Sequence, residues 1–291
     1  MITAVGLVFS LMPEPGGTME SCALRLGIPT LLEMKTPADG AAICRSLGMQ
    51  FVELNLNFPG FQPETLRRSH LDRLAASSGI FFTAHFDDNL NVADFNGRVA
   101  EAAAETVLDM IALAGETGMP VLNMHLPRGG VYTTPQKKWY FFEAYRQAYL
   151  DRMAAFRDRC TAAAEGIPVK LCVENTDGFL PFQQETLALL LESPLFGLTL
   201  DVGHNRCAGG VDEPLYRRYT DRLRHLHLHE VQPGGRDHQA FGTGEVDLAA
   251  CLRFAAAHGC TAVAEVKTLP ALEQSAAWLD RQSSRSSTSS I

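Results

Sequence analysis

The strongest constraint on the fold is the repeated alternation of two kinds of segment along the chain. Eight short β-rich runs predict strands, and they lie at 26–32, 51–56, 80–85, 121–126, 169–174, 197–201, 223–229 and 261–266. Longer helical stretches separate many of them, at 37–47, 64–77, 99–117, 138–164, 183–191 and 248–258. Strands that alternate with crossover helices form a parallel sheet. The pattern therefore predicts an α/β protein.

The length of the chain favours one closed sheet. Its 291 residues slightly exceed the roughly 250 typical of a (β/α)₈ barrel, and no shift in composition marks a second domain. We expect a single (β/α)₈ TIM barrel over residues 24–282. Residues 1–23 contain helix-breaking prolines and glycines and are expected to be an N-terminal extension outside the core, with Met19 a candidate natural start. The serine-rich residues 283–291 have nothing to bury and predict a disordered tail.

Composition disfavours several classes of partner. No apolar run approaches the roughly 18 residues that cross a membrane. The net charge of −8 repels nucleic-acid phosphates. Seven cysteines are scattered without a C-x-x-C spacing, which is typical of reduced thiols in the cytoplasm. The apolar start has no basic residue before it and fits a secretory signal poorly. We expect a cytoplasmic protein that binds neither membranes nor nucleic acid. The sequence leaves open whether the chain forms a homo-oligomer.

Side-chain alternation predicts which residues face the barrel axis. In the run 223–229, Leu226 and Leu228 share one face, and His225, His227 and His229 share the other. Leucines face the surrounding helices, so the histidines face the axis near the carboxyl end of the strand, where barrel active sites are built. The same alternation points further polar side chains inward at strand ends: Glu53, Asn55, His85, His125, Glu174, Asp201 and Glu265.

Carboxylates and imidazoles from seven strands are therefore expected at one mouth of the barrel. Glu174, Asp201 and Glu265 would not all stay ionised close together without a compensating cation. A divalent metal ion supplies that charge, and mixed oxygen and imidazole ligands suit Mn²⁺, Zn²⁺, Co²⁺, iron or Mg²⁺. The sequence predicts a metal site without identifying the metal.

Several of these side chains also have simpler interpretations. Asp201 precedes Val-Gly-His and could cap a following helix. His225 lies deeper in its strand and is expected to be a hydrogen-bonded histidine instead of a ligand. Glu53, His229 and Lys267 could be ordinary polar groups at the barrel rim.

Five features of the chain resemble the xylose isomerase-like TIM barrel superfamily. They are Val-Glu-Asn around Glu174, Asp-Val-Gly-His at 201–204, His-Leu-His-Glu at 227–230, Phe-Gly-Thr-Gly-Glu-Val-Asp at 241–247, and Glu265. The resemblance covers about residues 24–280. This superfamily includes sugar phosphate isomerases and epimerases, inosose dehydratases and the endonuclease-IV-type phosphodiesterases of AP endonuclease family 2. The resemblance implies that four residues bind the metal ion, with His204 beside them. This metal quartet consists of Glu174, Asp201, His227 and Glu265.

The isomerase and epimerase branch implies one set of roles. In that branch two metal-binding glutamates exchange a proton with a carbon next to a carbonyl group, and here they would be Glu174 and Glu265. The residues expected to bind a small carbohydrate substrate are His204, Glu230, His85, Asn55 and Lys267. The segment 128–139 would be a lid over that substrate, or the start of an amphipathic helix.

The phosphodiesterase branch implies a di- or trinuclear site as the alternative. There His85 and His125 would add one metal ion to Glu174, and His204 and His238 another. The branch has an aspartate two residues before the histidine equivalent to His238, whereas this chain has Arg236 there and Asp237 displaced by one.

The departure at Arg236 and the negative net charge favour the isomerase or epimerase branch. The chain also lacks an evident basic, aromatic-studded loop for holding a duplex. The leading hypothesis is a divalent-metal-dependent isomerase or epimerase of a small sugar, sugar phosphate or polyol. Metal-dependent phosphodiester hydrolysis is the second hypothesis, and an inactive barrel that serves as a binding protein is the third.

Overall fold

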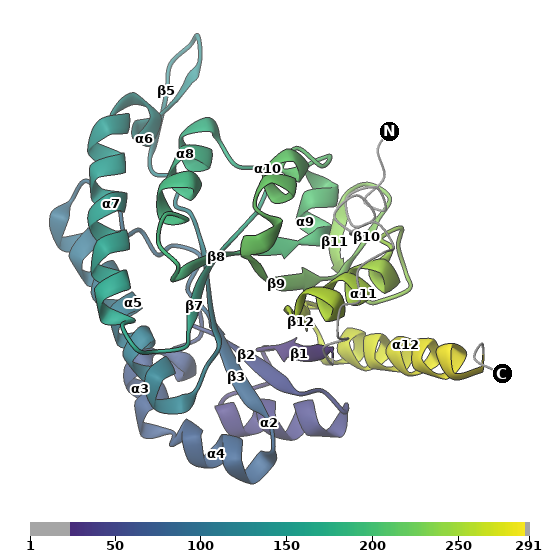
Figure 1. Ribbon diagram of the computed structural model, residues 1–291. Coiled ribbons are helices and arrows are strands. Elements are labelled where there is room, and N and C mark those ends of the chain that lie inside the picture. The colour runs from purple at the N-terminus through teal and green to yellow at the C-terminus, as the bar shows by residue number, and fades with distance from the viewer. Residues whose placement is uncertain (1–23, 289–291) are drawn as a thin grey trace.

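Eight parallel strands close into a barrel in the computed structural model, which describes residues 24–288 (Figure 1). Around the ring the strands follow the order β1-β12-β9-β8-β7-β4-β3-β2. Their bounds are β1 Arg25–Pro29, β2 Phe51–Asn55, β3 Phe81–His85, β4 Val121–His125, β7 Lys170–Glu174, β8 Phe196–Asp201, β9 Leu223–Leu228 and β12 Thr261–Ala264. Each overlaps one predicted run, so the predicted (β/α)₈ TIM barrel is confirmed. The expected N-terminal extension with Met19 lies outside the described residues.

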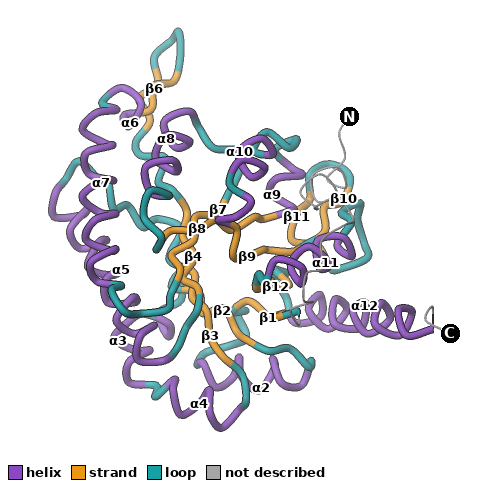
Figure 2. The backbone as a smooth tube through the Cα atoms, viewed as in Figure 1, coloured by secondary structure: helices purple, strands orange, loops and turns teal. Residues whose placement is uncertain are grey.

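Helices surround the ring of strands (Figure 2). Local signals explain several boundaries, such as the reciprocal cap between Thr36 and Asp39 that starts α2. The helices are α2 Pro37–Ser46, α3 Pro63–Arg68, α4 Leu71–Ser78, α5 Gly97–Thr117, α6 Phe141–Ala144, α7 Arg146–Ala163, α8 Pro181–Leu190, α9 Val202–Cys207, α10 Glu213–Arg218, α11 Leu248–His258 and α12 Leu269–Thr288, with 3₁₀ turns at Pro59–Phe61 and Thr220–Arg222. None of them, over the described residues, is long and apolar enough to span a membrane.

Two predicted helices are interrupted in the structure. The segment 64–77 divides into α3 and α4, because His70 adopts a left-handed backbone conformation with φ of 50°. The segment 138–164 begins as a strand: β6 (Lys138–Tyr140) pairs with β5 (Val131–Thr133) in an antiparallel hairpin. Figure 1 shows this hairpin projecting away from the barrel. The segment expected to be a lid or a helix start is therefore a protruding hairpin.

The carboxyl-terminal helix was not predicted. Helix α12 is anchored by Leu272, Ser275 and Ala276, which are buried. It continues to Thr288, whereas the serine-rich composition predicts disorder from residue 283. Serine is only a moderately poor helix former, and extending an existing helix costs far less than starting one. A second short hairpin, β10 (Glu230–Gln232) with β11 (Arg236–Gln239), follows β9.

The barrel interior is apolar at one end and polar at the other. At the amino-terminal end the Phe51 ring fills the barrel, and only glycine fits at Gly27 because a Cβ there would lie 2.4 Å from that ring. Leu226 and Leu228 face the helices and are fully buried, as alternation predicts. Toward the carboxyl ends of the strands most buried interior side chains are polar, and they include Glu53, Thr83, Asn123, Glu174, Thr199, His225 and His227.

Candidate metal centre

Four side chains from neighbouring strands of the ring meet at its carboxyl end. Their possible ligand atoms all lie within 4.8 Å of one another, and they belong to Glu174 on β7, Asp201 on β8, His227 on β9 and Glu265 just after β12. Nδ1 of His227 lies between two carboxylates, 3.1 Å from Glu174 Oε1 and 2.9 Å from Glu265 Oε2. The predicted quartet is thus assembled in space by the strand alternation that was read from the sequence.

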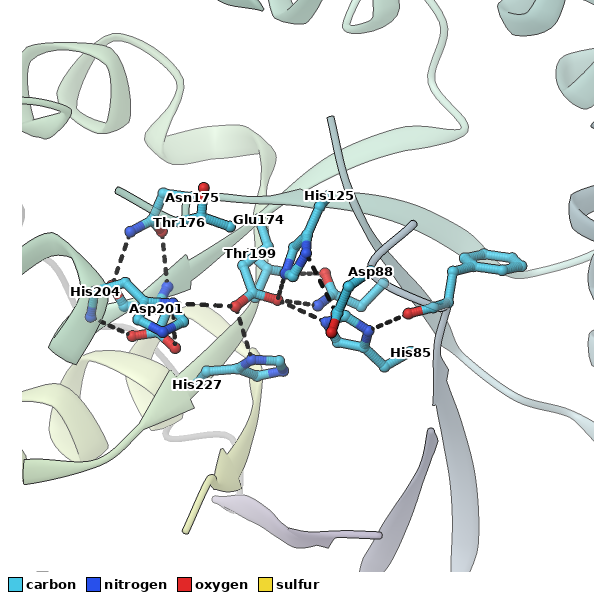
Figure 3. Close-up of polar contacts among 12 residues, drawn as sticks. His85, Asp88, His125, Glu174, Asn175, Thr176, Thr199, Asp201, His204 and His227 are labelled. Carbon is cyan, nitrogen blue, oxygen red and sulfur yellow. Dashed lines mark hydrogen bonds and ion pairs between the residues drawn. The ribbon is translucent and has the colours of Figure 1, made fainter. Parts of the chain in front are cut away.

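Glu174 lies at the centre of the polar contacts (Figure 3). Its Oε2 accepts hydrogen bonds from the Asn123 amide and, at 3.1 Å, from Nε2 of His85, while Nε2 of His125 lies 3.6 Å away. Burial alone would raise the pKa of Glu174, but the His227, His125 and His85 imidazoles hold it well below its usual value. The carboxylate is therefore ionised and available as a ligand or a base.

His85 is held by an acceptor on each side of its ring. Nδ1 donates to the Phe86 carbonyl at 2.6 Å, and Nε2 faces Glu174. Although burial lowers the pKa of His85, the hydrogen bond to Glu174 and its charge raise it to about 9. His125, the other histidine of the predicted additional site, packs edge-to-face on His85 with ring centroids 4.8 Å apart.

Asp201 has two roles that the sequence presented as alternatives. Its Oδ1 accepts the His204 backbone N–H at 2.7 Å, so it caps α9, and its carboxylate also belongs to the quartet. The Asn175 side chain holds the backbone of Asp201 with two hydrogen bonds. Its Oδ1 accepts the Asp201 N–H at 2.9 Å, and its amide donates to the Asp201 carbonyl at 3.0 Å. The buried Tyr216 hydroxyl lies 2.7 Å from Asn175 Oδ1. Neither Asn175 nor Tyr216 was predicted.

Glu53 lies inside the barrel, below the quartet, and not at the rim. Its carboxylate is 2.9 Å from Nε2 of His227 and accepts a hydrogen bond from Nε2 of His225 at 3.0 Å. Burial would raise the pKa of Glu53, but the two imidazoles lower it strongly. His225 also contacts the Thr261 hydroxyl at 2.6 Å. The expected hydrogen bonding of His225 is confirmed, and His225 also forms a group of possible ligands with Glu53 and His227.

Three further histidines surround Asp201. His204 Nδ1 lies 3.2 Å from Asp201 Oδ2, and His229 Nε2 lies 3.0 Å from Oδ1, so His229 is buried beside the quartet and not at the rim. His238 stacks on His229 and lies 3.7 Å from Glu265 through Nε2. Arg236 is exposed on β11, and Asp237 contacts Nδ1 of His238 at 3.1 Å.

A cavity of about 280 Å³ opens beside Glu265. Three of the five predicted substrate-binding residues line it, namely Asn55, His85 and Lys267. Lys267 Nζ donates to Glu265 Oε1 at 2.7 Å. The cavity is at the small end of the range for ligand pockets, which begins near 300 Å³. A small substrate fits it.

The other two predicted substrate residues lie elsewhere. His204 is beside Asp201 and does not line this cavity. Glu230 is buried and its carboxylate accepts the backbone N–H groups of Gly242 and Val246, at 3.1 and 2.9 Å. It therefore organises the loop 241–247 instead of facing the cavity.

The residues present fit a divalent cation. In the described part of the chain, most of the buried side-chain nitrogen and oxygen atoms without a hydrogen-bond partner belong to this cluster, and those near the quartet include Nδ1 of His227, His204 Nδ1, His125 Nε2 and Glu265 Oε2. Buried polar atoms are costly unless they are satisfied, and a cation satisfies oxygen and imidazole donors together. The six cysteines of residues 24–288 are free thiols and none belongs to the cluster.

Comparisons with known proteins place the chain in one family and show similar solved structures with the same fold. Residues 41–282 match the family model described as xylose isomerase-like TIM barrel. A D-tagatose 3-epimerase-like protein is similar in structure with a TM-score of 0.71 and 20% identity, covering 89% of this chain and 96% of that chain. The 3-keto-D-glucoside 4-epimerase YcjR from E. coli is similar with a TM-score of 0.68 and 12% identity, and the match covers 89% of this chain and 100% of that chain.

A third solved structure, the TTHB071 protein from Thermus thermophilus soaked with ZnCl₂, gives a TM-score of 0.62 and 21% identity, covering 89% of this chain and 97% of that chain. At these identities the likeness shows a shared fold. The comparison with curated protein sequences gives no significant match. Since the family model spans most of the barrel, this chain belongs to the xylose isomerase-like TIM barrel family.

Proposed function

We propose that this protein is a divalent-metal-dependent isomerase or epimerase that acts on a small sugar, sugar phosphate or polyol. The observation that carries the proposal is the placement of two carboxylates, the buried Glu174 and the partly exposed Glu265, on either side of Nδ1 of His227. Glu265 also lines the cavity where a substrate would bind. The epimerases among the structural neighbours have the same fold and support this class of reaction.

Glu174, Asp201, His227 and Glu265 would hold the metal ion. When bound, the ion would polarise the substrate's oxygens and offset the three carboxylate charges. Zinc fits the mixed oxygen and imidazole donors, as do manganese and cobalt. Asn123 and His85 keep the Glu174 carboxylate in place, and Lys267 does so for Glu265.

The two glutamates would move the proton. Isomerisation or epimerisation next to a carbonyl group requires one base to take a proton from carbon and an acid to return it. Glu174 and Glu265 reach the site from β7 and β12, which are separated in the ring by β8 and β9. They therefore approach a shared centre from different directions, as a two-base exchange needs.

The test compares two reactions of the same purified protein. Incubation with a panel of ketoses in heavy water should place deuterium on a carbon next to the carbonyl group, with one metal ion per chain by elemental analysis. A chromogenic phosphodiester should stay intact. Hydrolysis of the phosphodiester with two or three metal ions per chain, and no deuterium in any ketose, would overturn the proposal.

A second candidate function is supported by one observation. Besides the quartet and the group of Glu53, His225 and His227 inside the barrel, residues 24–288 contain two further groups of possible ligands, His85 with Glu174 and His227, and Asp201 with His204, His229 and His238. They would suit a metal-dependent phosphodiester hydrolase with a multinuclear site. The net charge of −8 weighs against a nucleic-acid substrate.

A further inference from the structure

His229 is a buried residue beside the quartet for which the proposed reaction needs no role. It follows β9, and its side chain is fully buried. It lies within ligand distance of Asp201, His204 and His238 in one of the groups that could hold a cation. The hydrogen bonds of its ring, however, restrict what His229 can do.

The backbone of His238 fixes the proton on the His229 ring. The His238 N–H donates to Nδ1 of His229 at 2.8 Å, whereas the Glu230 carbonyl lies farther from that nitrogen, at 3.4 Å, so the shorter contact assigns Nδ1 as an acceptor with a free lone pair. The neutral ring therefore carries its proton on Nε2. That nitrogen lies 3.0 Å from Asp201 Oδ1 and 3.2 Å from Oδ2 and donates to the carboxylate. A nitrogen that carries this proton is not a metal ligand.

The ring is also held in place by packing on both sides. His238 stacks on it with ring centroids 4.2 Å apart and 9° between planes. Gly203 lies against the ring edge, and a Cβ at that position would lie 1.9 Å from Cε1 of His229. Only glycine admits the ring there, within the Asp-Val-Gly-His stretch that also contains Asp201.

We propose that His229 is a positioning residue that orients the Asp201 carboxylate for the metal ion and is not itself a ligand. Asp201 is then restrained from two sides, by the His204 backbone N–H at the start of α9 and by Nε2–H of His229. Hydrogen bonds from neighbouring groups typically orient ligands and change metal affinity by about 10- to 100-fold. The inference rests on the proposed metal site.

Two substitutions separate this role from a structural one. His229→Gln keeps a donor near the position of Nε2 but loses the acceptor for the His238 N–H. His229→Asn keeps an acceptor near the position of Nδ1 but no longer reaches Asp201. Positioning predicts that His229→Asn weakens Zn²⁺ binding by about 10- to 100-fold, while His229→Gln stays much closer to the wild type. A merely structural role predicts the reverse order.

The measurement is the Zn²⁺ affinity and stoichiometry of the full chain, by competition with a chromophoric chelator. Gly203→Ala provides an independent route, because it displaces the His229 ring without removing a polar group, and it should weaken Zn²⁺ binding as His229→Asn does. Thermal melting of the chelator-treated variants checks that each one folds.

Three results would overturn the proposal. Equal affinities of the wild type and both His229 variants would remove the positioning role alone. The loss of a bound ion from the chain in His229→Asn, instead of a weaker affinity for it, would make His229 a ligand. A wild-type protein that binds no Zn²⁺, Mn²⁺ or Co²⁺ would overturn the proposed metal site together with this inference.

Discussion

Nε2 of His227 lies 2.9 Å from Oε1 of Glu53, while Nδ1 of the same ring faces Glu265 at 2.9 Å and Glu174 at 3.1 Å. One nitrogen is thus directed to a carboxylate in the barrel interior, and the other is left for the quartet. A carboxylate behind a ligating histidine fixes its tautomer and its ring orientation. Glu53 supplies that support from β2, on the other side of the barrel.

Glu53→Gln should weaken metal binding without abolishing it. The amide removes the charge that faces Nε2 of His227, and the expected loss of Zn²⁺ affinity is about 10- to 100-fold. Isothermal titration of chelator-treated protein measures it. Glu33→Gln, at an exposed position, is the matched control and should leave the affinity unchanged. Equal affinities of the two variants would show that Glu53 does not support His227.

Asp201→Asn and Asp201→Ala should separate the two roles of this residue. Asparagine caps helices as well as aspartate does, so Asp201→Asn should retain the start of α9 but lose metal binding with the charge. Asp201→Ala should lose both, and unfold with a free energy about 1 kcal/mol lower than that of Asp201→Asn. Chemical denaturation of the metal-free variants checks the difference. Identical stabilities would mean that the cap contributes nothing.

Tyr216→Phe should destabilise the fold modestly. The substitution removes the hydroxyl 2.7 Å from both Asn175 Oδ1 and the Thr199 carbonyl, inside the barrel wall. Loss of one buried hydrogen bond costs about 0.5–1.5 kcal/mol, and more where an acceptor is left unsatisfied. Urea denaturation measures the change in the free energy of unfolding. Tyr132→Phe in the exposed hairpin is the control. A similar loss of stability in that variant would show that the effect of Tyr216→Phe does not come from its buried hydrogen bonds.

The metal-free protein should lose stability as the pH falls. Although burial raises it, the His227, His125 and His85 imidazoles hold the pKa of Glu174 well below its ordinary value of 4.5. A carboxyl group with a lowered folded-state pKa stabilises the protein above its unfolded-state pKa, and this contribution is lost as the pH falls through the folded-state pKa. The melting temperature of chelator-treated protein should therefore fall below about pH 4.5.

Glu174→Gln tests the source of that loss. The variant lacks the titrating carboxyl, so its melting temperature should fall less steeply over the same acid range. Equal slopes for the wild type and Glu174→Gln would show that Glu174 does not carry the acid sensitivity.

The barrel was predictable because each strand is a short β-rich run, and in most of these runs apolar and polar side chains alternate. All eight strands and the inward direction of Glu174, Asp201 and His227 follow from alternation. The helix boundaries were less predictable. The left-handed backbone at His70 and the pairing of Lys138–Tyr140 with Val131–Thr133 depend on neighbouring segments, which local periodicity does not report.

The supporting residues of the site were the hardest to predict. Asn123 had a usable signal, because it shares its strand face with His125 and so points inward. Asn175 belongs to the Val-Glu-Asn stretch, but nothing in the sequence pointed to its partner Tyr216, which lies 41 positions away, after the chain has passed through β8. Glu230 was predicted to hold substrate, yet it organises a loop, since only the folded chain shows which donors surround a carboxylate.

Deuterium exchange by the two glutamate variants tests the central claim most directly. Wild-type protein loaded with one metal ion per chain should exchange the proton of a substrate ketose with heavy water. Glu174→Gln and Glu265→Gln should each slow that exchange by about 10²- to 10⁴-fold, the usual contribution of a general acid or base. Unchanged exchange and unchanged metal content in both variants would contradict the assignment of this site.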